Sequence, residues 1–503
     1  MGIVLLSYVH WIALIKPSES LVYTSCFGTY QCARLSVPID WNSTSSNGSR
    51  VAIAIMKMPA PVPITDYRYG GAILLNPGGP GGSGINFMLR EAVNISEAVN
   101  PLSSAGTTQE GKYFDLISWD PRGVNNTTPH LECFHDALSY DFWRYQEEVG
   151  GIDHTSDISL SLAWARWKAL METCAKGKST TSRKENGDLF AWEAVLDRTK
   201  RYKGDEKLQY WGFSYGTVLG ATFAAVYPER VGRMVLDGVA DAYDYYPTGW
   251  MRNLNDTDKI MSKFYEYCSE ARPEKCAMNI GNSSSSDIQN LVESLISPAI
   301  VTYLDVLSMF RTMLYRPLHY FPEMAELLAD LVHGNGTAFA VYKQNAYKRT
   351  CPLTDAKDEK SGGSSCQPPT GGEEVTRVIL CSDGRDISNS MKVDFKGNIT
   401  ALYQQSKYFG LFGRQSLCLV VIGSAHAMSK RFRGSVVLQQ NSEGHCTGQS
   451  PSVCTYGFIC NYFQTGDLPP VGAICQPDEL PLVGNATVPK GDFSEKMTFP
   501  LLT

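Results

Sequence analysis

Short apolar runs that end at turn residues recur through the first half of the chain. They occupy residues 51–56, 71–75, 113–119, 208–212 and 234–236. Short apolar runs bounded by Gly, Pro or Asp are typical of buried strands. A helix-like segment at residues 218–226 follows the fourth run. Strands that alternate with helices predict an α/β fold with a mostly parallel sheet and right-handed crossovers.

The apolar spacing changes to a helical one at about residue 241. Residues 304, 307, 310, 313 and 314 are all apolar, at the three- and four-residue steps of one helix face. We expect a helical cap over residues 241–375, inserted between core segments 21–240 and 376–503. Further apolar runs at residues 378–381, 418–422 and 436–438 predict three more strands after the cap.

Length and charge agree with a core that carries a cap. A chain of 503 residues is too long for one compact core of ordinary size. The net charge of -6 includes no Lys/Arg block, so nucleic acid is not an expected partner. We expect no membrane span, because no later stretch reaches the roughly 18 apolar residues that one requires. Residues 1–20 fit either a weak signal peptide or a misassigned start, since His10 interrupts their apolar stretch.

The cysteines and the glycosylation sequons favour the secretory pathway. Fourteen cysteines without paired CxxC motifs indicate disulfides, and we expect no metal and no cofactor. An N-x-S/T triplet is the acceptor signal for an N-glycan. Such triplets begin at Asn42, Asn47, Asn94, Asn125, Asn126, Asn255, Asn282, Asn335, Asn398 and Asn485. Together these features predict a secreted glycoprotein.

A GxSxG motif at residues 212–216 places Ser214 between a predicted strand and a predicted helix. This context distinguishes a nucleophile elbow from a chance match in a turn. The flanking glycines permit the tight turn that exposes the serine hydroxyl. The helix N-terminus behind the serine favours developing negative charge. We therefore predict Ser214 as the nucleophile.

A glycine-rich loop at residues 76–84 follows an early predicted strand. An acyl-transfer serine requires backbone N–H donors for the oxyanion, and glycines let such donors approach the substrate. A flexible linker and a phosphate loop are the alternatives, but the loop has no Gly-Lys-Ser/Thr ending and its prolines stiffen it. We predict that the N–H groups of Gly79 and Tyr215 form the oxyanion hole.

The catalytic base is expected late in the chain, because the triad order of this architecture is Ser, acid, His. Among the eight histidines, His445 fits best, since it follows the last predicted strand in a turn-like segment. By position alone, a surface-loop histidine is an equally good interpretation. His426 lies on a predicted helix and is the weaker candidate.

In combination, these motifs resemble the tripeptidyl-aminopeptidase-like branch of the α/β-hydrolases, which are secreted serine exopeptidases related to prolyl iminopeptidases. The similar segments are residues 32–38, 76–84, 114–123, 212–216, 235–239, 256–259, 380–384, 444–446, 466–469 and Cys475. The resemblance implies that His445 is the base and that the substrate is a peptide cleaved near its N-terminus.

The resemblance also exposes a missing residue. Relatives carry an Asp in a Gly-x-x-x-Asp-Pro-Val-Thr-Pro loop after a strand like residues 418–422, but here the chain continues directly into helix-like residues 425–428. Loss of this acid typically costs on the order of 10⁴ in turnover. A gene model that skipped a short coding stretch and a decayed paralogue are the two explanations. We favour the first, because the other motifs are intact, and resequencing the transcript over residues 413–425 would test it.

Three acidic residues near the site have other expected roles. Asp383 and Asp386 follow the run at residues 378–381, so one of them is a candidate substitute acid, although a structural role fits better. Asp383 is also a candidate partner for the free amine of a substrate. Asp120 and Arg122 resemble the family's Asp-Pro-Arg-Gly turn, where we expect a structural ion pair.

Three functions are therefore in competition. The first is a serine exopeptidase that releases short peptides from N-termini. The second is a carboxylesterase, because the same machinery cleaves esters and amides. The third is an inactive α/β-hydrolase fold retained for binding, which the missing acid favours.

Overall fold

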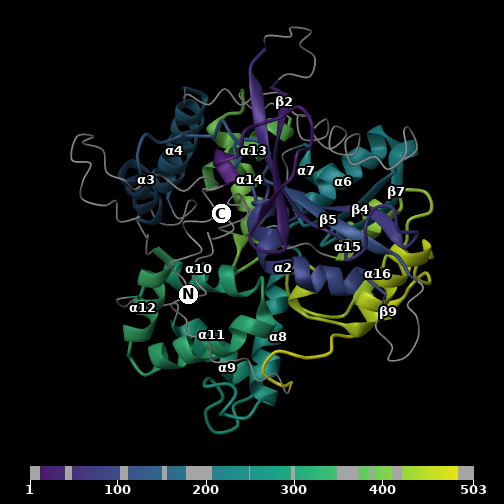
Figure 1. Ribbon diagram of the computed structural model, residues 1–503. Coiled ribbons are helices and arrows are strands. Elements are labelled where there is room, and N and C mark those ends of the chain that lie inside the picture. Colours follow the sequence, from purple (N-terminus) through teal and green to yellow (C-terminus); the bar gives the residue numbers. More distant parts are fainter. Residues whose placement is uncertain are drawn as a thin grey trace, which may run out of the picture.

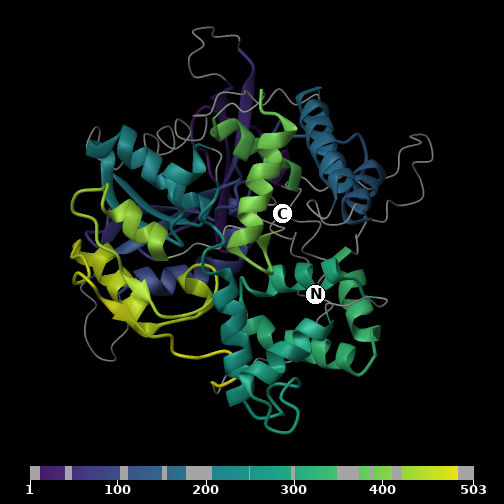
Figure 2. The same ribbon diagram turned by 180° about the vertical axis from the view of Figure 1, so that it is seen from behind.

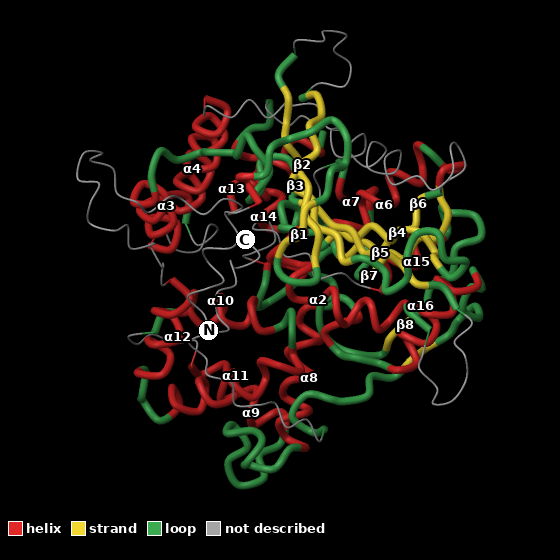
Figure 3. Tube along the Cα trace, in the orientation of Figure 1, coloured by secondary structure: helices red, strands yellow, loops and turns green. Residues whose placement is uncertain are grey.

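The computed structural model describes residues 12–39, 48–101, 111–149, 156–176, 207–247, 250–295, 301–347, 373–385, 389–410 and 422–484. A seven-stranded sheet in the order β1-β2-β3-β5-β4-β6-β7 forms the centre of this part of the chain (Figures 1 and 3). Its strands are β1 (Thr24–Cys26), β2 (Tyr30–Pro38), β3 (Arg50–Met58), β4 (Tyr69–Asn76), β5 (Tyr113–Trp119), β6 (Leu208–Phe213) and β7 (Val231–Asp237). Strands β5, β4, β6 and β7 are mutually parallel, and β1, β2 and β3 join them in antiparallel order.

Helices cover both faces of the sheet. Along β4, Ile73 and Leu75 pack with α2 (Gly84–Val99) and α16 (Val453–Thr465), whereas Leu74 packs on the opposite face with α6 (Tyr215–Val226). Burial on both faces explains why these strands are continuous apolar runs rather than alternating ones. The five runs predicted as strands in residues 51–236 coincide with β3 to β7, which confirms the α/β fold class.

Five helices between β7 and α13 share a separate hydrophobic core, and they lie below the sheet in Figure 1. They are α8 (Thr257–Glu270), α9 (Ser285–Leu295), α10 (Tyr303–Met313), α11 (Pro317–Val332) and α12 (Thr337–Tyr347). Phe264, Phe310 and Phe321 are fully buried at the centre of this core. We call this helical group the cap. The short helix α7 (Ala242–Tyr245) precedes it.

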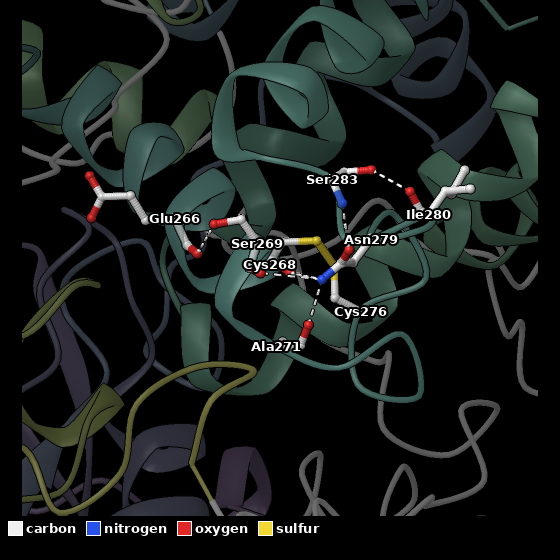
Figure 4. The surroundings of a disulfide bond; sticks show 8 residues. All are labelled: Glu266, Cys268, Ser269, Ala271, Cys276, Asn279, Ile280 and Ser283. Atoms are coloured by element: carbon white, nitrogen blue, oxygen red, sulfur yellow. Dashed lines mark hydrogen bonds between the residues drawn. A yellow bond between two sulfur atoms is a disulfide. The ribbon is translucent and has the colours of Figure 1, made fainter.

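A disulfide between Cys268 and Cys276 closes the turn after α8 (Figure 4). The buried side chain of Asn279 donates to the carbonyl oxygens of Cys268 and Ala271 at 3.1 and 2.6 Å, and its own oxygen accepts the N–H of Ser283. One amide therefore satisfies carbonyls that the end of α8 leaves open.

The described part of the chain contains four disulfides, which require an oxidising environment. Besides the cap disulfide, the described part of the chain contains Cys26–Cys32, Cys133–Cys174 and Cys454–Cys475. The prediction of disulfides is confirmed at these positions. The cysteines at positions 381, 446 and 460 form no disulfide with another described residue.

The predicted strand at residues 378–381 is wrong, because this run lies in helix α13 (Glu373–Asp383). Val375 and Leu380 of this helix are buried. A run of four apolar residues is too short to separate the two periodicities. Helix α13 and α14 (Lys392–Gln405) pack against α4 (Asp157–Lys176), which lies beside α3 (Ala137–Val149) (Figure 2).

The other two predicted strands have different outcomes. Residues 418–421 lie outside the described residues, and Ile422 begins helix α15 (Ile422–Ser429), which confirms the helix expected at residues 425–428. Residues 436–438 form a loop, so this strand prediction is wrong, and only the adjoining β8 (Gln439–Gln440) pairs with β9 (Ile474–Cys475). The side chains of residues 436–438 are only half-buried.

Residues within the segment 1–20, the possible signal peptide, contact the core. Within the single-turn helix η1 (Ile12–Leu14), Ile12 is fully buried against the sheet. The guanidinium of Arg34 donates to the carbonyl oxygen of Ala13 at 2.6 Å. Removal of residues 1–20 would therefore also remove these contacts.

Candidate active site

Ser214 lies in a sharp turn between β6 and α6. Its backbone has φ 56° and ψ -123°, a conformation that L residues rarely adopt and that usually persists only where function requires it. The N–H of Ser214 donates to the carbonyl oxygen of Asp237 at the end of β7 (2.9 Å). A Cβ on Gly212 would lie 2.6 Å from the carbonyl oxygen of Gly216, which explains the first glycine of the motif. The turn therefore has the geometry of a nucleophile elbow.

The glycine-rich loop packs directly against this elbow. A Cβ on Gly78 would lie 2.3 Å from the carbonyl oxygen of Phe213 and 2.9 Å from the backbone nitrogen of Tyr215. Gly79 has φ +114°, which also favours glycine. The loop is thus held at the N-terminus of α6 through Gly78, and Gly79 and Tyr215 remain the predicted oxyanion donors. The close approach of Gly78 has no signal in the sequence, because it depends on a contact between the ends of β4 and β6.

Asp120 fixes the end of the glycine-rich loop by hydrogen bonds. It is fully buried and accepts hydrogen bonds from the hydroxyl of Ser83 and from the N–H of Ile85 at the start of α2. Asn126 donates to it twice, through its backbone and its side-chain nitrogen. Burial raises the pKa of Asp120, and these hydrogen bonds oppose that shift.

The ion pair predicted between Asp120 and Arg122 is wrong. The guanidinium of Arg122 donates instead to the carbonyl oxygens of Pro38 and Ile39, at 3.1 and 2.8 Å. The hydroxyl of Ser83, the N–H of Ile85 and the two donors of Asn126 satisfy the aspartate without a cation. A buried carboxylate that accepts several hydrogen bonds does not require an ion pair.

His445 lies on a loop that is fixed at the carboxyl end of β7. The hydroxyl and the N–H of Thr447 donate to the carboxylate of Asp237 at 2.6 and 2.9 Å, and the thiol of Cys446 donates to its carbonyl oxygen at 3.5 Å. That carbonyl also accepts the N–H of Ser214. We call Asp237 and these three partners the Asp237 clamp. Through the clamp, Ser214 and His445, which are 231 positions apart in the sequence, are both held at Asp237.

The cap holds the other side of the histidine loop. The N–H of His445 donates to the carbonyl oxygen of Tyr315 at 3.0 Å, and the two rings meet edge to face at 4.9 Å. The hydroxyl of Tyr267, on α8, donates to Glu443 at 2.9 Å. His445 is therefore held between the core and the cap, which excludes the interpretation as a surface-loop histidine.

One ring nitrogen of His445 lacks the interaction that a catalytic triad would provide. Nδ1 is buried and has no hydrogen-bond partner among the described residues. Burial lowers the pKa of His445 to about 4. The imidazole is therefore neutral at neutral pH and can accept a proton, but the described residues offer no carboxylate that would stabilise the imidazolium.

Asp383 lies beside Tyr215, the residue that follows Ser214, and not beside His445. Its Oδ2 accepts hydrogen bonds from the hydroxyls of Tyr215 and Tyr245, at 2.7 and 2.8 Å. The carboxylate is only partly buried. Asp386 lies outside the described residues. His426 is exposed on α15, so it is not brought to the site.

A cavity of about 670 Å³ opens beside these groups, between helices α2 and α16 of the core and helices α10 to α12 of the cap. His445, Cys446 and Phe213 line it at the catalytic end. Its volume is within the range of about 300–1,000 Å³ that is usual for small-ligand sites. A cavity of ligand size therefore lies next to the Asp237 clamp, and His445 but not Ser214 is among its lining residues.

Comparisons with known proteins agree with this geometry. Residues 71–298 match a family model described as alpha/beta hydrolase fold, and residues 420–475 match one described as TAP-like protein. The chain therefore has an α/β-hydrolase fold, as the sequence predicted. The match of its C-terminal part to the TAP-like model agrees with the resemblance seen in the sequence.

Three curated relatives show the range of the group. The chain is 29% identical over 276 residues to the serine protease Hip1 of Mycobacterium tuberculosis, covering 54% of this chain and 46% of the relative. It is 29% identical to the tripeptidyl aminopeptidase of Streptomyces coelicolor (42% and 35% covered) and 33% identical to a carboxylesterase B of M. tuberculosis (29% and 25% covered). The matched region spans less than half the length of each relative.

Proposed function

We propose that this protein is a serine hydrolase that releases short peptides from polypeptide N-termini through an acyl-enzyme. The Asp237 clamp is the observation that carries the proposal, because it joins the strained elbow of Ser214 to the loop of His445. Structural roles alone would not require a strained serine and a buried, neutral histidine at the same strand end. Relatives named as a serine protease and a tripeptidyl aminopeptidase support the peptidase interpretation.

The proposed reaction has two steps. The Oγ of Ser214 attacks the scissile carbonyl carbon while His445 accepts the hydroxyl proton, and the N–H groups of Gly79 and Tyr215 hold the oxyanion. The tetrahedral intermediate collapses when the C–N bond breaks and His445 returns the proton to the leaving amine. Water then attacks the acyl-enzyme with His445 as base, which releases the N-terminal fragment and restores Ser214.

The unpartnered Nδ1 of His445 limits this reaction. Each step passes through an imidazolium, and the buried ring has no carboxylate near it among the described residues. We therefore expect slow acylation in the chain as written.

Asp383 is the proposed partner for the free amine of the substrate. Its carboxylate is held by two phenol hydroxyls next to the elbow, so an ammonium group there would lie close to the nucleophile. An Asp383→Asn protein should lose its preference for substrates with a free amine. If that protein still required a free amine, this role would be excluded.

A carboxylesterase is the second candidate, favoured by the relative named carboxylesterase B. An inactive binding protein is the third, favoured by the unpartnered Nδ1. A fluorophosphonate probe separates the enzymes from the binding protein, because only an activated serine reacts with it. Labelling should occur in the parent and be absent in Ser214→Ala, and its absence in both proteins would refute the enzyme proposal. Free and N-blocked tripeptide anilides, assayed beside a simple ester, then separate the exopeptidase from the esterase.

We further propose an extracellular or envelope location. The disulfides favour an oxidising compartment. Exposed acceptor side chains for N-glycans are Asn94, Asn255, Asn282 and Asn335. Asn126 is a poor acceptor in the folded protein, because it is buried against Asp120. No helix within the described residues is long and apolar enough to span a membrane.

A further inference from the structure

The cavity beside His445 carries charge on both of its walls. Three arginines line it, Arg90 on α2 and Arg311 and Arg316 from the cap, together with the acidic residues Glu91 and Glu97. The whole chain is acidic, with a net charge of -6, so a cavity in which arginines outnumber acids departs from the average surface. Such a departure inside a cleft indicates the charge of the ligand that the cleft attracts.

The core wall is one face of α2. Phe87, Arg90, Asn94 and Ala98 follow one another at steps of three and four residues, and all four line the cavity. The apolar members supply contact area, and Arg90 supplies the positive charge. Glu91 is the acidic neighbour on this face, and its carboxylate accepts the side-chain N–H of Asn94 at 3.5 Å.

The cap wall brings a second guanidinium toward Arg90. Arg316 precedes the first turn of α11, and its carbonyl oxygen accepts the N–H groups of His319 and Tyr320 at 3.0 Å each, so its backbone is fixed. Burial lowers the pKa of Arg90, the charge of Arg316 lowers it further, and Glu91 only partly opposes them. Arg90 and Arg316 therefore line the same cavity from its core wall and its cap wall, and an anion bound there would lie near both side chains.

Resting on the proposed function, we propose that Arg90 and Arg316 form a carboxylate-binding subsite, so that preferred substrates carry a carboxylate near the bond that Ser214 attacks. Guanidinium groups bind carboxylates through charge-assisted and often bidentate hydrogen bonds. The aromatic lining, which includes Tyr315 and Tyr320, would pack against the rest of the peptide. The carboxylate belongs either to an acidic side chain or to the free C-terminus of a short peptide.

Binding to the Ser214→Ala protein tests the subsite without turnover. Three tripeptides are compared by calorimetry: Ala-Ala-Glu amide, Ala-Ala-Gln amide and Ala-Ala-Gln with a free C-terminus. We expect the first or the third to bind about tenfold more tightly than the neutral amide. A preference for the first identifies a side-chain carboxylate, and a preference for the third identifies the C-terminus.

Variants of the arginines connect that preference to the subsite. Arg90→Gln and Arg316→Gln, each in the Ser214→Ala background, should reduce the tenfold ratio to about one, while Arg90→Lys should retain part of it. Arg433→Gln removes the same charge from an exposed position outside the cavity and should preserve the ratio. Thermal melts confirm that each variant is folded.

The outcomes separate this inference from the proposed function. Equal affinities for all three peptides, no binding at all, or an unchanged ratio in both Gln variants would overturn the subsite. Fluorophosphonate labelling of Ser214 without any carboxylate preference would leave the proposed function intact and remove the subsite. A carboxylate preference without labelling of Ser214 would support the subsite and refute the proposed function.

Discussion

Restoring an acid beside His445 should restore most of the missing catalytic power. The proposed change inserts the family's Gly-x-x-x-Asp-Pro-Val-Thr-Pro loop immediately before Ala425, at the start of α15, where Gly423 is exposed and offers room for an insertion. The same loop with Asn in place of the Asp is the matched control, since it has the same length and shape but no charge.

The magnitude follows from the state of the imidazole. Burial lowers the pKa of His445 from 6.5 to about 4. At about 1.36 kcal/mol per pKa unit, forming the imidazolium in this site costs roughly 3 kcal/mol more than in water. A carboxylate that offsets this cost should accelerate serine acylation by about 10²–10³, and the loss of about 10⁴ seen when a triad loses its acid sets the upper bound.

The second-order rate of fluorophosphonate labelling, measured from pH 3 to 9, checks this expectation. In the chain as written, the rate should rise through about pH 4, where His445 becomes neutral, and then stay low and flat. With the Asp loop the plateau should rise, and the midpoint should move upward, because a carboxylate favours the charged imidazole. Equal rates for the Asp and Asn loops would refute this reasoning, and so would a gain that survives in Ser214→Ala.

Three further predictions concern stability. Burial and Glu326 raise the pKa of Glu323 to about 7, so its stabilising contribution below pH 4.5 is lost as the pH rises toward 7. Glu323→Gln should therefore raise the free energy of unfolding by about 1–3 kcal/mol at pH 8 and leave it unchanged at pH 4. Urea unfolding at the two pH values measures this difference. Thr447→Val removes the hydroxyl hydrogen bond of the Asp237 clamp, which should cost about 1–3 kcal/mol and slow labelling, whereas the exposed Thr173→Val should cost less than about 0.5 kcal/mol. Asn279→Ala removes the hydrogen bonds at the cap disulfide and should lower stability by about 2–3 kcal/mol in the same assay, with no change in labelling.

The sequence predicted those parts of the fold that local patterns determine. The strands β3 to β7 were identifiable because each is an apolar run with a turn signal behind it. Ser214 was identifiable because its motif lies between a strand and a helix. Helix α13 was misread because its apolar run is short and its helical identity depends on packing against α4 and the glycine-rich loop, where Thr376 donates to the carbonyl oxygen of Pro80 at 2.6 Å.

The parts of the site that the sequence did not reveal depend on long-range contacts. Asp237 could be placed at the end of a strand, but its role depends on Thr447, which is 210 positions later. The charged cavity likewise combines α2 with the cap, and no sequence spacing relates Arg90 to Arg316. Local patterns carry no signal for such pairs, because the chain brings them together only after the sheet and the cap have formed.

The same contacts bear on the missing acid. Ser214 and Cys446 both keep positive φ angles, of 56° and 67°, and strain of this kind typically costs about 1–3 kcal/mol per residue. A paralogue that no longer catalysed would gain stability by relaxing these residues and by releasing the buried carboxylate of Asp237. Within the part of the chain that the structure describes, both the strain and the clamp are present, and Nδ1 of His445 is the ring nitrogen that lacks a hydrogen-bond partner. Strand β7, the outermost strand in the described part of the sheet, is only half-buried over most of its length. The proposed site lacks one acid, and the strand next to it is partly uncovered. Both observations favour the explanation that a short coding segment was skipped, rather than the explanation that the protein is a decayed enzyme.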